Sequence, residues 1–173
     1  ALRRQVAENP AASHGYMPNA GFPRVRELLA ERLRRQSGLD FTPRHLLMTV
    51  GSAGAINTVL KAMLDPGDEV IVPMPCFSEY QFYIANHAGK MVPVETDEDF
   101  SLDVGAVRAA ITSRTRAIIL NSPHNPTGVI YSEAVLRELQ ALLASLDHTL
   151  VVISDEPYRA HVYDGALMPE AVS

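Results

Sequence analysis

The sequence contains no tryptophan, a single cysteine at position 76 and only two lysines among its 173 residues. One cysteine cannot form an internal disulfide, so a disulfide-stapled secreted fold is excluded. No apolar run approaches the roughly 20 residues that a membrane-spanning helix needs, and no signal peptide is visible after Ala1. These shortages predict a protein that works in the reducing cytoplasm without contact to a membrane.

Positive charge is scarce as well. The chain has 15 lysines and arginines against 20 aspartates and glutamates, which gives a formal net charge of −5 and a pI near 5.6. Because no basic pattern stands out, we expect neither nucleic acid nor an anionic membrane as a partner, and we expect no metal site. Hydrophobic residues make up 47% of the sequence, which is enough to bury one core in a domain of this length.

Hydrophobic patterns predict helices that alternate with strands. Apolar residues at helical spacing, with Pro23 in the first turn and Gly38 as a stop, predict a helix from Pro23 to Gln36. Further helices are predicted at residues 53–64, 77–87, 102–111 and 132–146, the last capped by Ser132, and strands at residues 46–50, 70–72, 91–94, 117–120 and 150–153. The predicted class is α/β: a mostly parallel sheet with helices on both faces, after an N-terminal arm at residues 1–22.

In an open parallel sheet, ligands bind beyond the carboxyl ends of the strands, and unusual residues follow several predicted strands here. The small residues Gly51, Ser52 and Ala53 open a helix whose free N–H groups and positive dipole end could hold a phosphate. A tight strand-to-helix turn is the alternative for this segment. Phe77 follows another strand and could stack on a planar ligand or simply pack in the core.

Two further segments carry polar candidates. Asn125 lies in a proline-stiffened loop, residues 122–128, that either presents its amide to a ligand or forms a simple Asx turn. Asp155 follows the last strand and could hold a heteroaromatic nitrogen protonated, or could merely cap a short helix. We expect Cys76 to be an inert thiol, and His124 to support its loop rather than act as an acid or base.

Taken in order, these segments resemble the class I and II aminotransferases, the fold type I enzymes that depend on pyridoxal 5'-phosphate (PLP). The matching stretches are Tyr16-Met17-Pro18-Asn19-Ala20-Gly21-Phe22-Pro23 with Arg26, Gly51-Ser52-Ala53-Gly54-Ala55, Asp65-Pro66-Gly67-Asp68-Glu69-Val70, Asn125-Pro126-Thr127-Gly128 and Asp155-Glu156-Pro157-Tyr158. The resemblance implies the aspartate aminotransferase type of large domain, with residues 23–173 forming part of it.

The resemblance also implies a role for each candidate. Residues Gly51 to Ala53 would hold the PLP phosphate and Phe77 would stack on the ring, a position where tryptophan or tyrosine is frequent. Asn125 and Tyr158 would bind the phenolic oxygen, and Asp155 would pair with the pyridine nitrogen. Tyr16 would reach the phosphate of a neighbouring subunit, which implies a homodimer with shared sites.

The implied reaction moves an amino group between an amino acid and a 2-oxo acid, and it needs a lysine that forms a Schiff base with PLP. Lys61 and Lys90 do not occupy the family's lysine position, which lies downstream of the Asp-Tyr segment. We therefore interpret the sequence as a fragment that is incomplete at its C-terminus and inactive by itself.

Three other interpretations remain open at this level. The same segments occur in PLP-dependent carbon-sulfur β-lyases. A natural or engineered truncation could bind PLP or a partner without catalysis. A Rossmann-type nucleotide domain is the third, although no Gly-x-Gly-x-x-Gly follows the first predicted strand.

Overall fold

The computed structural model describes residues 15–163, 165 and 168–169, and it divides the chain into two compact units, Ala1–Thr49 and Val50–Ser173. The predicted arm at residues 1–22 falls inside the first unit, and its first 14 residues lie outside the described part, so this boundary stays a prediction. No helix within the described ranges combines the length and apolar character needed to cross a membrane.

The first unit is built around helix α2, Pro23–Ser37. Pro23 occupies the first turn, where its missing N–H costs nothing, and Gly38 ends the helix in the left-handed conformation at φ 73°. This helix and its two boundary signals are confirmed. Arg26 in α2 donates to the carbonyls of Leu46 and Pro43, which holds α2 beside the short 3-10 helix η1, Pro43–His45.

The strand predicted at residues 46–50 is wrong. These residues are assigned neither helix nor strand, and they pair with none of the strands in the described structure. A strand needs a neighbour for its backbone N–H and C=O groups. Met48 instead donates its N–H to the carbonyl of Ala20, 3.1 Å away, inside the first unit.

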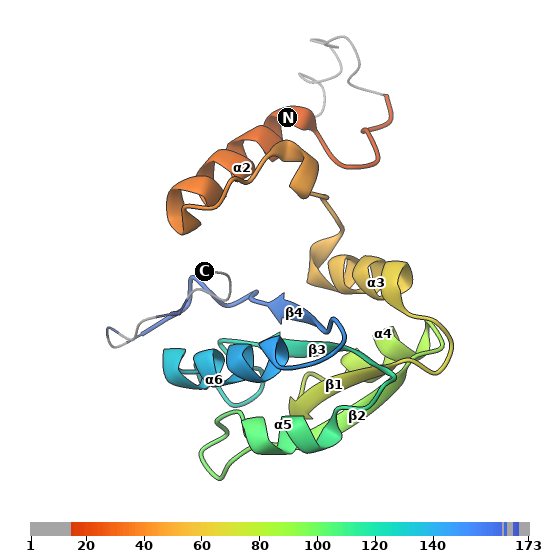
Figure 1. Cartoon of the computed structure of the whole chain (residues 1–173). Coiled ribbons are helices and arrows are strands. Elements are labelled where there is room, and N and C mark those ends of the chain that lie inside the picture. Colours follow the sequence, from red (N-terminus) through yellow and green to blue (C-terminus); the bar gives the residue numbers. More distant parts are fainter. Residues whose placement is uncertain (1–14, 164, 166–167, 170–173) are drawn as a thin grey trace. The chain divides into compact units, whose positions relative to one another are not determined.

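The second unit is a parallel α/β layer structure (Figure 1). Its strands are β1 (Glu69–Met74), β2 (Lys90–Glu95), β3 (Thr115–Asn121) and β4 (Val151–Asp155), arranged in the order β2-β1-β3-β4 with every pairing parallel. Its helices are α3 (Gly51–Met63), α4 (Tyr80–Ala85), α5 (Val104–Ala110) and α6 (Glu133–Ala144). The predicted class is therefore confirmed.

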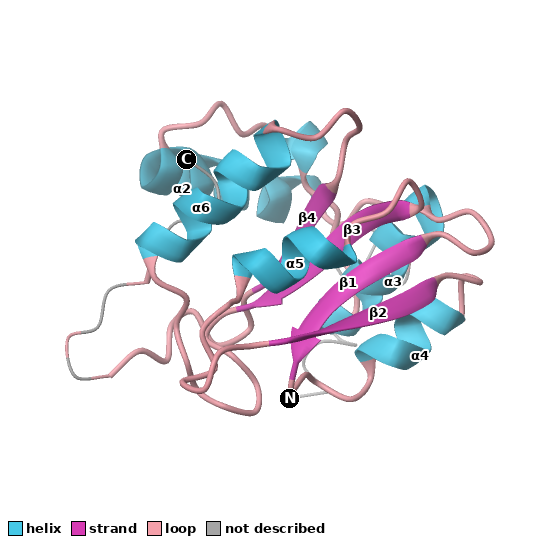
Figure 2. Cartoon of the chain, turned by 60° about the horizontal axis from the view of Figure 1, so that its bottom comes forward, coloured by secondary structure: helices cyan, strands magenta, loops and turns pink. Residues whose placement is uncertain are grey.

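Helices cover both faces of this sheet (Figure 2). Alternate side chains of each strand point to opposite faces. Ile71 and Ile118 pack with α5 and α6, whereas Val70, Val72 and Ile119 pack with α3 and α4. This two-sided burial explains why the inner strands β1 and β3 contain continuous apolar runs instead of an alternating pattern.

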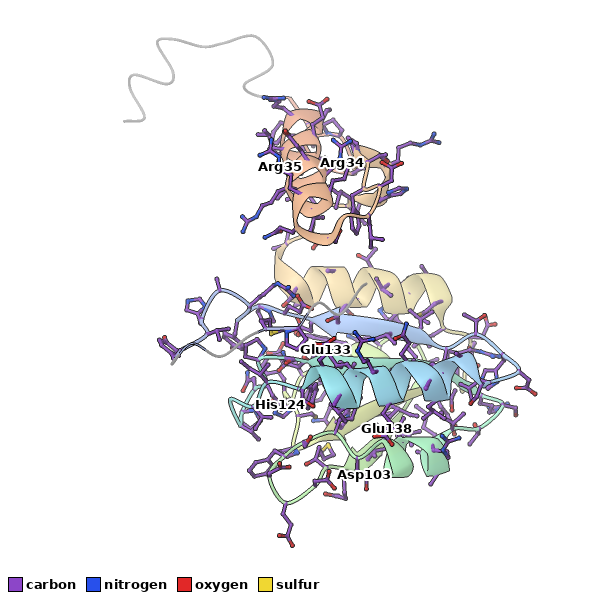
Figure 3. The ribbon with its side chains drawn as sticks, turned by 60° about the vertical axis from the view of Figure 1, so that its left-hand side comes forward. Arg34, Arg35, Asp103, His124, Glu133 and Glu138 are labelled. Atoms are coloured by element: carbon purple, nitrogen blue, oxygen red, sulfur yellow. The ribbon has the colours of Figure 1, made fainter. Side chains whose placement is uncertain are left out.

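The helix boundaries follow local hydrogen bonds. Ser132 accepts the N–H of Val135 and caps α6, as predicted, and Asp103 caps α5 by accepting the N–H of Ala106 at 2.8 Å. The Asp103 cap was not predicted. Figure 3 shows Asp103 at the start of α5 and Glu133 at the start of α6, where a negative charge complements the helix dipole. Helix α4 starts three residues later than expected, because residues 78–79 form a turn.

Candidate functional site

The polar candidates of the second unit gather at the carboxyl ends of the strands. Loops 75–79, 122–130 and 156–158 follow β1, β3 and β4, and the first two contain the cis peptide bonds Met74–Pro75, Ser122–Pro123 and Asn125–Pro126. In the described residues no group of three or more histidine, cysteine, aspartate or glutamate side chains could hold a metal ion.

Asp155 is the last residue of β4 and is buried, with 8% of its surface exposed. Its Oδ2 accepts a hydrogen bond of 2.6 Å from the hydroxyl of Tyr80, and its backbone carbonyl accepts one of 2.8 Å from the Asn121 amide. Residues 157–160 form turns and not a helix, so Asp155 does not cap a helix as the alternative interpretation expected. A buried carboxylate held in this way is suited to a cationic ring nitrogen.

Asn125 and Tyr158 come together from different loops. The Asn125 Nδ2 lies 3.5 Å from the Tyr158 hydroxyl, at the outer limit of a hydrogen bond. The position of Asn125 is fixed by a second hydrogen bond, because its backbone N–H donates to the Asn121 Oδ1 at 2.7 Å. Asn121 thus supports both Asn125 and Asp155. Its role was not predicted, and the available signal in the sequence is a polar residue that ends an apolar strand.

The segment Gly51-Ser52-Ala53 forms the first turn of α3. Gly51 has φ 69°, which glycine adopts without strain, and the preceding Val50 has no side-chain acceptor with which to cap the helix. Ser52 and Asp155 line the same cavity of about 560 Å³, whose walls are otherwise mostly apolar side chains of α3 and β4. An anion at this helix start would therefore lie in the cavity that Asp155 borders.

Phe77 is half-buried and lies edge-on to the ring of Tyr80, with 5.6 Å between ring centroids. The neighbouring Cys76 is half-buried as well, and burial raises the pKa of its thiol. A raised pKa keeps the thiol protonated and unreactive, in line with the expectation for Cys76.

His124 is a buried residue of the loop after β3 (labelled in Figure 3), with Nδ1 2.7 Å from the Thr127 hydroxyl. Burial lowers the pKa of His124, while a hydrogen bond with the backbone of Pro75 opposes this shift. A neutral imidazole therefore ties the loop after β3 to the loop after β1. This is the supporting role that the sequence analysis expected.

Neither lysine of the chain reaches this site. Lys90 begins β2 and pairs with Glu69 at 3.2 Å, at the opposite end of the sheet. Lys61 lies in the last turn of α3, nine residues or about 13 Å along the helix from Ser52. Tyr16 belongs to the first unit and is fully exposed, so its predicted contact with a neighbouring subunit stays a prediction.

The donor set fits PLP. A buried acid suits the pyridine nitrogen, an amide and a phenol suit the ring oxygen, and a helix start with a serine suits the phosphate. Of the predicted residues, Ser52 and Asp155 line the cavity, whereas Phe77, Asn125 and Tyr158 are not among its lining residues. Their individual roles stay predictions.

Comparison with known proteins agrees with this chemistry. The model of the family described as aminotransferase class I and II matches residues 1–172. The chain is 42% identical over 167 residues to an aspartate/prephenate aminotransferase of Thermus thermophilus, and 45% identical over 166 residues to a protein of Thermus aquaticus named "Probable aspartate/prephenate aminotransferase". Each match covers 95% of this chain and 42% of the relative, so the chain spans less than half the length of these relatives.

Solved structures show the same fold. An aspartate aminotransferase from Thermus thermophilus with maleate superposes with a TM-score of 0.85 at 41% identity, covering 96% of this chain and 43% of that one. An aminotransferase from Eubacterium rectale gives a TM-score of 0.90 at 33% identity, covering 98% of this chain and 44% of that one.

Proposed function

Because the chain belongs to the class I and II aminotransferases, we propose that the protein is a PLP-dependent transaminase. These 173 residues would form the part that binds the cofactor. The proposed reaction moves an amino group between an amino acid and a 2-oxo acid. The chain covers 42% of its relatives, so the activity is proposed for the whole protein and not for this polypeptide alone.

The observation that carries the proposal is the buried carboxylate of Asp155 at the carboxyl end of β4. It borders the cavity that also contains Ser52 at the start of α3. The cavity lining thus combines a carboxylate with a serine from the first turn of a helix, which matches a ligand with a cationic ring nitrogen and an anionic phosphate.

When bound, PLP would supply an electron sink for chemistry at the α-carbon of an amino acid. Asp155 would keep the proton on the ring nitrogen. Asn125 and Tyr158 would bind the ring oxygen and set the tilt of the ring, and Phe77 would cover one ring face. Ser52 and the backbone of the first turn of α3 would anchor the phosphate. These contacts lie away from the reacting atoms of PLP and would orient them.

The reaction also needs a lysine to carry the cofactor and move the α-proton. Lys61 and Lys90 lie away from the site. The proposal therefore requires that the lysine come from outside these 173 residues.

Aspartate is the first amino donor to assay, because both Thermus relatives are named for it. We further propose a cytoplasmic homodimer. The single cysteine supports the reducing compartment, and the exposed Tyr16 would complete the phosphate site of the partner subunit. Light scattering of the full-length protein tests the dimer, and the Tyr16→Phe variant tests the shared site through its affinity for PLP.

The proposal is tested with Asp155→Asn in the full-length protein. Loss of the carboxylate removes the charge that holds the ring nitrogen protonated, so we expect kcat with aspartate and a panel of 2-oxo acids to fall about 100-fold or more. The unaltered full-length protein, mixed with PLP and reduced with borohydride, should show one PLP adduct by intact mass.

Asp147→Asn is the matched control, because Asp147 is an exposed aspartate whose partner is the adjacent His148. We expect this variant to keep full activity. Unchanged activity of Asp155→Asn, or the absence of any adduct on the unaltered full-length protein, would contradict the proposal.

A further inference from the structure

Tyr80 contacts two of the predicted cofactor residues at once. It is the first residue of α4 and only 2% of its surface is exposed. Its hydroxyl donates to the Asp155 Oδ2 at 2.6 Å, and its ring packs edge-on against Phe77 at a centroid distance of 5.6 Å. A single side chain thus joins the loop after β1 to the acid at the end of β4.

We propose that Tyr80 is a positioning residue, which sets the orientation of the Asp155 carboxylate and the Phe77 ring so that PLP meets both as one preorganised surface. This inference rests on the proposed function. It adds a residue to which neither the sequence analysis nor the resemblance gave a role.

The hydrogen-bond geometry supports this assignment. A carboxylate rotates freely about its last torsion unless its oxygens are held. Tyr80 holds Oδ2, and the described residues give Oδ1 no hydrogen bond, so one oxygen is anchored while the other is left for a ligand in the cavity that Asp155 lines. Freezing this rotation before the ligand arrives lowers the entropy cost of binding.

The protonation state of the Tyr80 phenol also suits a hydrogen-bond donor to Asp155. Burial, and then the hydrogen bond and charge of Asp155, raise the pKa of Tyr80 well above its ordinary value. A raised pKa favours the protonated hydroxyl, which is the form that donates to Asp155. Tyr83, one turn further along α4, donates its hydroxyl to Glu79 instead, and so provides a tyrosine on the same helix with no bond to Asp155.

A purely structural role for Tyr80 is the alternative, because its ring belongs to the core cluster between the sheet and helices α3 and α4. The two roles depend on different atoms. Core packing depends on the ring, whereas positioning of Asp155 depends on the hydroxyl. Tyr80→Phe removes only the hydroxyl and therefore separates them.

The experiment is a PLP titration of the full-length apoprotein in a double-mutant cycle. We expect Tyr80→Phe to raise the Kd for PLP about three- to tenfold, because the anchor of a charged acceptor is lost. In an Asp155→Asn background the same change should alter the Kd less than twofold, because the carboxylate to be positioned is absent. Tyr83→Phe is the control, and its Kd should match that of the unaltered protein.

An unchanged Kd in Tyr80→Phe, or an equal rise with and without the Asp155 carboxylate, would overturn the inference while leaving the proposed function intact. If the unaltered full-length protein does not bind PLP at all, the proposed function fails and this inference fails with it. If Tyr80→Phe does not fold, Tyr80→His and Tyr80→Leu replace it. Retention of PLP binding by the histidine variant alone, which keeps a ring N–H donor, supports the inference, and equal binding by both overturns it.

Discussion

Two buried carboxylates lie at opposite ends of the sheet and have different partners. Asp155, at the carboxyl end of β4, is held by one phenol and borders a cavity. Glu69, at the start of β1, is surrounded by its own partners: the Thr112 hydroxyl at 2.6 Å and the Lys90 ammonium at 3.2 Å. The first arrangement leaves room for a ligand, whereas the second is satisfied within the protein and is structural.

Glu69→Gln is predicted to destabilise the protein in a pH-dependent way. The Thr112 hydroxyl, and then Lys90, lower the pKa of Glu69 below its ordinary value of 4.5, against the opposing effect of burial. A lowered folded-state pKa stabilises the protein above the unfolded-state pKa, and this stabilisation is lost as the pH falls toward the folded-state value. We expect a loss of about 1 kcal/mol at neutral pH that shrinks below about pH 4.5.

Urea unfolding midpoints at neutral pH and near pH 4 measure this effect. Glu138→Gln is the control, because Glu138 is an exposed residue of α6 away from the start of the helix. A destabilisation by Glu69→Gln that stays constant over this pH range would show that the charge of Glu69 is not its source.

At the scale of elements, the motif at residues 16–23 has a structural explanation in the first unit. The N–H of Gly21 donates to the Pro18 carbonyl at 2.8 Å, which closes a turn, and the Ala20 carbonyl then accepts the N–H of Met48. Gly21 has φ 98°, and a Cβ placed on it would lie 2.6 Å from the Cβ of Met48. Glycine is needed here for its conformation and for its size.

Gly21→Ala should therefore destabilise the first unit by about 2–3 kcal/mol, since it adds a steric clash to the cost of a left-handed residue. Gly38→Ala is the matched variant: Gly38 also has a positive φ, but a Cβ there meets no atom within 4 Å. We expect this second variant to lose only about 1 kcal/mol. Equal losses, measured by urea unfolding or by hydrogen exchange of α2, would rule out the contact with Met48 as a factor.

At the scale of the whole molecule, the proposed cofactor site depends on segments far apart in the chain. The start of α3 and the loops after β1, β3 and β4 all belong to the second unit and contribute to one edge of its sheet. A ligand that contacts all four segments would hold them together. Binding that is restricted to the folded state raises stability by mass action.

Removal of PLP should accordingly lower the thermal midpoint of the full-length protein. At a PLP concentration of 100 times Kd, the free energy of unfolding rises by about 2.7 kcal/mol. Differential scanning calorimetry with and without PLP measures this change. Pyridoxal, which lacks the phosphate, is the comparison ligand and should stabilise less, because it cannot use Ser52 and the first turn of α3. Equal stabilisation by both ligands would argue against a phosphate site at α3.

Much of the fold followed from the sequence, because its signals are local. Pro23 and Gly38 bound α2, and Ser132 caps α6. Apolar runs mark the inner strands β1 and β3, which are buried on both faces, and the outer strands β2 and β4. Each of these depends on neighbours within about one helical turn or one strand. The order of the predicted site segments was available for the same reason, since each segment directly follows its own strand or opens its own helix.

Other features were decided only by tertiary structure. The apolar run at residues 46–50 reads as a strand, but strand formation depends on a partner elsewhere in the chain, and the described structure provides none. In the sequence, Tyr80 is one apolar position of a predicted helix, yet its hydroxyl donates to Asp155, which lies 75 residues further along the chain. The Asn121 amide likewise donates to the backbone of Asp155, 34 residues away in sequence. The sequence by itself determined which side chains are available at the sheet edge. Which of them touch was set by the packing of parallel strands and their covering helices, because such contacts depend on the path of the whole chain.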